Sequence, residues 1–83
     1  MAKDKIRYQH KGTDICVRNY WNKTELLFND TVVDTWKGVV SVTFTLNGQI
    51  GEDSVDLVLY PIFVGATMKL FINGQPVAKA WTL

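Results

Sequence analysis

The chain has one cysteine, one histidine and two prolines among its 83 residues. A single cysteine excludes an intramolecular disulfide framework, and with the one histidine it leaves at most two soft ligands, too few for a zinc site. The six glycines are scattered singly, so there is no Gly-rich loop that could hold a phosphate. The sequence therefore predicts no cofactor and no metal site.

Long apolar runs are also missing. The uncharged run at residues 57–68 has 12 residues and the longest one, at residues 38–51, has 14, whereas a membrane-spanning helix needs roughly 20. The N-terminus, MAKDKIRYQHKG, is charged and lacks the apolar centre of a signal peptide. Together with the lone cysteine, these features predict a cytoplasmic protein without a membrane span.

The formal net charge of +1 conceals a gradient along the chain. Residues 1–23 carry a net charge of +4, residues 24–60 carry −5, and residues 61–83 contain two lysines and no acidic residue. The opposite charges of these segments either pair with each other across neighbouring strands or mark a surface that binds a partner.

Apolar and polar residues alternate through most of the chain, and no helical stripe is present. In residues 39–46 one predicted face carries Val40, Val42, Phe44 and Leu46. Similar alternation occurs in residues 5–10, 14–21 and 55–60, and the polar residues 47–54 are predicted to form a loop. We therefore predict a single β-domain over residues 1–83, an antiparallel β-sandwich of seven to eight short strands, or alternatively a small OB-like β-barrel.

Two stretches resemble each other, LLFNDTVVDTW at residues 26–36 and LFINGQPVAKAW at residues 70–81. Asn-Gly and Asn-Asp pairs favour two-residue hairpin turns, because both central residues of a type I′ turn need positive φ. The spacing then pairs Leu26 with Val33 and Leu70 with Val77, and we expect both pairs in the core. The repetition reflects either an internal duplication or hairpin chemistry alone, with one hairpin expected in each layer.

The order of these features resembles the Fas apoptotic inhibitory molecule family. The matching features are a strand with a basic start, the hairpin that ends in Trp36, a β-rich middle and the final segment KLFINGQPV. The resemblance covers most of residues 4–78 and implies a small β-sandwich that takes part in cell-survival signalling through protein contacts. It transfers no functional residue, since a shared fold does not carry an activity with it.

Catalytic chemistry has one candidate group, formed by His10, Asp14 and Cys16. Cys16 lies between Ile15 and Val17, and a cysteine in such surroundings usually behaves as a small buried hydrophobe. We therefore predict that the protein is not an enzyme and name no catalytic residue.

Two further patterns involve charged side chains. Glu52, Asp53 and Asp56 cluster as calcium ligands do, but their spacing matches no known calcium loop, so a solvated acidic turn is the preferred interpretation. Basic residues interleaved with aromatic ones near the N-terminus suggest a face that binds single-stranded nucleic acid. The residues of that face are Lys3, Lys5, Arg7, Arg18 and Tyr20.

In residues 60–68, YPIFVGATM, apolar residues continue through a proline and a glycine where a polar turn is expected. One interpretation is a bent strand covered by the other sheet. The other is an exposed apolar loop that docks on another protein chain, which could be a second copy. The docking residues would be Ile62, Phe63 and Val64, with Pro76 beside them on a sheet edge. We take this interaction module as the leading functional prediction.

Overall fold

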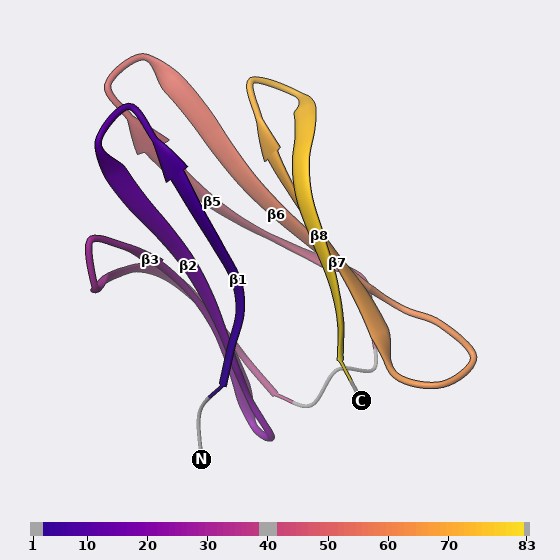
Figure 1. Ribbon diagram of the computed structural model, residues 1–83. Coiled ribbons are helices and arrows are strands. Elements are labelled where there is room, and N and C mark those ends of the chain that lie inside the picture. The colour runs from indigo at the N-terminus through magenta and orange to yellow at the C-terminus, as the bar shows by residue number, and fades with distance from the viewer. Residues whose placement is uncertain (1–2, 39–41, 83) are drawn as a thin grey trace.

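The computed structural model describes residues 3–38 and 42–82, which form eight antiparallel strands. The strands are β1 (Lys3–His10), β2 (Thr13–Tyr20), β3 (Lys23–Phe28), β4 (Thr31–Lys37), β5 (Phe44–Ile50), β6 (Asp53–Pro61), β7 (Ala66–Ile72) and β8 (Gln75–Thr82). Strands β1–β4 form one sheet and β5–β8 form the other, each in chain order, and the sheets are not closed into a barrel (Figure 1). The predicted small antiparallel β-sandwich is confirmed.

The core lies between the two sheets and is built from alternate residues of their strands. Its buried members are Ile6, Ile15, Val17, Leu26, Phe44, Leu46, Val55, Leu57, Leu59, Ala66, Met68, Leu70 and Ile72. Trp36 of β4 stacks on Phe44 of β5, with ring centroids 4.3 Å apart, and so connects the two sheets. The period-two pattern correctly identified the inward faces of β1, β2 and β6.

The two sheets follow the same plan, with one of the two similar hairpins in each layer, as predicted. Both hairpins turn on two residues of positive φ, Asn29–Asp30 and Asn73–Gly74. Each asparagine also bonds the second residue of the second strand of its own sheet: Asn29 Oδ1 accepts from the amide of Asp14, and Asn73 Oδ1 from that of Ser54, both at 2.9 Å. The second half therefore repeats the tertiary contacts of the first, and not only its hairpin turn.

The predicted pairs Leu26–Val33 and Leu70–Val77 are wrong by one residue. Leu26 faces Asp34 and Leu70 faces Ala78, because each hairpin has a β-bulge at the same position. A bulge inserts one unpaired residue and moves every later residue of its strand to the opposite face. Both leucines are fully buried, as predicted, whereas Val33 is exposed.

The predicted loop over residues 47–54 is also wrong, because β5 continues to Ile50 and only Gly51–Glu52 form the turn. Gly48 lies within β5, where a Cβ atom would come within 2.6 Å of the Phe28 ring of the other sheet. Glycine is needed here for close packing and not for a turn. The predicted strand over 39–46 begins at Phe44. Residues 39–41 lie outside the described residues, and Val42 is exposed.

Among the residues that the structure describes, no helix is long and apolar enough to cross a membrane.

Candidate functional site

The connection between β6 and β7 is an exposed apolar loop of residues 62–65, hereafter the apolar loop. It projects from one end of the sandwich, at the lower right of Figure 1. Ile62 and Val64 are about half exposed, and the relative exposure of Phe63 is 103%. Residues 62–64 are therefore exposed and not covered by the other sheet, whereas Ala66 and Met68 of the same segment are buried in β7.

The apolar loop is held in a defined conformation. The amide of Ile62 donates to the carbonyl oxygen of Gly65 at 3.1 Å. The indole Nε1–H of Trp81, on β8, donates to the carbonyl oxygen of Val64 at 2.9 Å. A loop ordered in this way would lose less conformational entropy on binding than a disordered one.

A comparison of the two halves shows that this loop is an addition. The corresponding connection of the first sheet, between β2 and β3, is a two-residue turn of Trp21 and Asn22. The other turns match in length between the halves, with two residues each at 11–12 and 51–52 and at 29–30 and 73–74. The apolar loop is thus where the second half departs from the plan of the first.

Pro76 does not lie beside the apolar loop. It faces Phe71 near the β7–β8 turn, whereas the loop precedes Ala66 at the opposite end of β7. Five residues of strand separate the two places, roughly 17 Å at the usual rise. The prediction that β8 is an edge strand is confirmed, but its proline is not part of the apolar loop site.

The basic N-terminal face is largely neutralised within the first sheet. Arg7 pairs with Asp4, at 2.6 Å, and with Asp14. Arg18 pairs with Asp4 at 2.9 Å and with Asp30 at 3.6 Å. The guanidinium groups of Arg7 and Arg18 lower the pKa of Asp4 to about 2, so its carboxylate stays charged at neutral pH. These arginines are therefore less available to phosphates than the sequence suggested.

The other residues of that predicted face do not form a stacking groove. Lys3 begins β1, and Lys5 falls at a β-bulge between Asp4 and Ile6. The ammonium nitrogen of Lys23 lies over the ring of Tyr20, 4.7 Å from the ring centroid. Neither arrangement provides the row of free aromatic faces on which successive bases stack.

Two buried residues lie on the outer face of the first sheet, which also carries the ion pairs of Arg7 and Arg18. Cys16 and Leu27 face each other across β2 and β3, and both are almost inaccessible although they lie outside the main core. The arginine side chains have long aliphatic stems, which can cover apolar surface while their charged ends remain in water. Burial raises the pKa of the Cys16 thiol.

We expect Cys16 to react with a disulfide reagent at pH 7 at least about a hundredfold more slowly than an unactivated thiol, because the reactive thiolate is disfavoured and reagent access needs local opening. Absorbance of the released reagent thiol measures the rate, and the urea-unfolded chain is the control. A rate equal to that of free cysteine would contradict this burial.

The candidate catalytic group is not assembled. His10 points away from Cys16 and meets Asp53 of the second sheet, with Nε2 2.8 Å from Oδ2. Asp53 also accepts from Lys11 and Asn73, at 2.9 Å each. Its bonds to His10, Asn73 and Lys11 lower the pKa of Asp53. This carboxylate joins the two sheets.

The acidic cluster of Glu52, Asp53 and Asp56 shows no arrangement for calcium. In the described part of the chain, no three His, Cys, Asp or Glu side chains are grouped so as to hold a metal ion.

The sequence did not indicate Trp81 as part of the apolar loop site, because its spacing places this residue at the end of the second hairpin.

No protein-family model matches the chain, and comparisons with curated proteins and with solved structures find no match either.

Proposed function

We propose that the chain is a non-enzymatic interaction module that docks on another protein chain through the apolar loop. The observation that carries this proposal is Phe63, an aromatic side chain exposed at the tip of an ordered loop. Buried aromatic residues dominate the energy of most protein interfaces. The exposed ring of Phe63 and its neighbours Ile62 and Val64 leave apolar surface in contact with water. Burying that surface against a partner chain would be favourable.

The comparison between halves supports the same location. The repeated features, such as Asn29 and Asn73, are accounted for by the fold. The apolar loop adds length and apolar surface that the fold does not require, since the first sheet makes the same connection with Trp21 and Asn22 alone. The resemblance to the Fas apoptotic inhibitory molecule family, which is associated with protein contacts, agrees with this proposal.

The direct test is photo-cross-linking in cells that make the protein, with benzoylphenylalanine in place of Phe63. The control carries the same group in place of Trp21, which is 80% exposed in the corresponding turn. We expect a discrete protein adduct from position 63 and not from position 21. Light scattering then shows whether the partner is a second copy. Identical adduct patterns from both positions, or adducts with nucleic acid alone, would contradict the proposal.

Replacing Phe63 with aspartate should weaken binding to the cross-linked partner by about thirtyfold or more, the loss typical of a central aromatic anchor. The melting temperature should stay within about 2 °C of the parent, because exposed positions contribute little to stability. Trp21→Asp, made in parallel, should leave binding unchanged. Unfolding of the Phe63→Asp variant would show instead that this side chain belongs to the core.

A further inference from the structure

The outer face of the β7–β8 hairpin carries two lysines directly opposite each other, Lys69 and Lys79. Like charges at opposed positions of a sheet repel each other. In the part of the chain that the structure describes, no carboxylate lies within 4.0 Å of either ammonium group, including that of Asp56 on the neighbouring strand β6. This differs from the first sheet, where Arg7 and Arg18 are paired with carboxylates.

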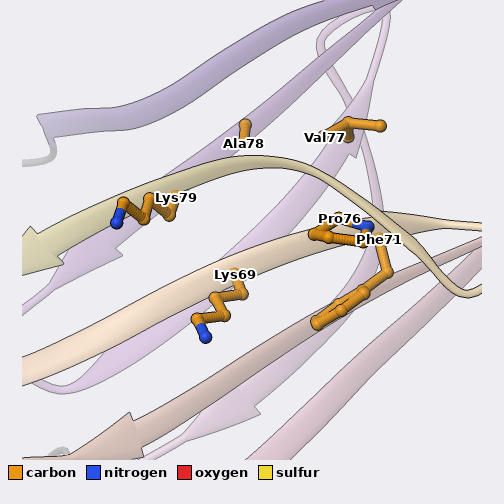
Figure 2. Close-up of a pocket in the computed structure, with 6 residues that line it drawn as sticks. All are labelled: Lys69, Phe71, Pro76, Val77, Ala78 and Lys79. Atoms are coloured by element: carbon orange, nitrogen blue, oxygen red, sulfur yellow. The ribbon is translucent and has the colours of Figure 1, made fainter.

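These lysines border a groove that follows the hairpin. A hollow of about 350 Å³ is lined by Lys69, Phe71, Pro76, Val77, Ala78 and Lys79, with both lysines on the same side of the hairpin as Phe71 (Figure 2). A second hollow of about 320 Å³ shares Lys79 and continues to Trp81. From Pro76 to Trp81 the groove spans five residue steps of β8, roughly 17 Å, the length of an extended segment of about five residues.

The chemistry of the groove changes along its length. Phe71 and Pro76 make one end apolar, the two lysines make the middle cationic, and Trp81 makes the other end apolar again. Trp81 also donates to the carbonyl oxygen of Val64, so this end of the groove lies beside the apolar loop. The complementary ligand is an extended chain with carboxylates in its middle and apolar residues at its ends.

We infer that this groove binds an extended acidic segment of the protein that docks on the apolar loop, an inference that rests on the proposed function. The two lysines pair with carboxylates of the segment, while Phe71 and Trp81 contact its apolar ends. Nucleic acid fits less well, because only two of the residues that line the groove are cationic, whereas proteins that bind single strands follow the backbone with a strongly positive groove.

The probe is the fluorescein-labelled pentapeptide Leu-Glu-Val-Glu-Leu, compared with Leu-Gln-Val-Gln-Leu by fluorescence anisotropy on the full chain. We expect the glutamate peptide to bind about fivefold more tightly than the glutamine peptide, as two solvent-exposed ion pairs allow. The Lys69→Ala/Lys79→Ala variant should abolish this difference. Lys37→Ala, which removes an exposed lysine from β4 of the other sheet, should preserve it.

Equal binding of the two peptides, or binding of neither, would overturn the inference. Tighter binding of a labelled ten-nucleotide oligothymidine than of the glutamate peptide, lost in the double variant, would assign the groove to nucleic acid instead. Cross-linking from position 63 is independent of these titrations. A discrete protein adduct there, combined with equal peptide binding, would leave the proposed function standing and remove only the acidic segment.

Discussion

Replacing Gly65 with alanine should lower the free energy of unfolding by about 3 kcal/mol, a large effect for one methyl group. A Cβ atom at this position would lie 2.1 Å from the carbonyl oxygen of Thr82 and 3.1 Å from the indole nitrogen of Trp81. The main chain of β8 and the apolar loop would therefore have to separate. Urea unfolding followed by tryptophan fluorescence measures the change.

Gly12→Ala is the matched control for this prediction. Gly12 has the same φ of +82° as Gly65, but a Cβ atom there would meet nothing within 4 Å. Its substitution should cost only the left-handed backbone strain, about 1 kcal/mol. The difference between the variants isolates the close approach at Thr82, and equal losses would show that the apolar loop does not pack against β8 as described.

Leu26→Ala should destabilise the protein by about 3–4 kcal/mol, within the range for a leucine truncated in a close-packed core. Leu26 is fully buried between the sheets, next to the bulge of the first hairpin. Few neighbours can move into the space, because they are core side chains on strands whose backbones are fixed by the two sheets. The loss should appear as a lower urea midpoint with an unchanged dependence on denaturant.

Leu27→Ala is the informative comparison, because Leu27 faces outward yet is only 1% exposed. Leu27 lies on the face that carries the flexible side chains of Arg7 and Arg18, and such side chains can move into a cavity more readily than core residues, so we expect a smaller loss of about 2 kcal/mol. A loss below about 0.5 kcal/mol, normal for a surface position, would show that this leucine is not shielded from water.

The fold was largely predictable from the sequence, because its signals are local. Asn29–Asp30 and Asn73–Gly74 specify their turns through backbone conformation alone, and alternation identified the buried faces of most strands. The wrong loop prediction over residues 47–54 involved a contact between distant segments. Gly48 resembles a turn residue until the Phe28 ring from the other sheet is placed over it.

The candidate site was predictable only in part, and the bulge in β8 is the reason. Without it, the register of the β7–β8 turn would place Lys79 and Trp81 on the inward face, opposite Met68 and Ala66. With it, Lys79 faces Lys69 and Trp81 faces Thr67, both on the outer face. Sequence spacing does not reveal a bulge, so the apolar loop was anticipated while the groove was not.

The order of the strands also affects how the chain folds. Many all-β proteins fold slowly because their strand pairings join distant segments of the chain. Here the six pairings among the described residues all join consecutive strands, across connections of two to four residues. The entropy lost on closing such short loops is small. Each sheet can therefore form hairpin by hairpin. The only step that joins distant segments of the described chain is the packing of one four-stranded sheet on the other, and the contact between His10 and Asp53 links the two sheets at one end.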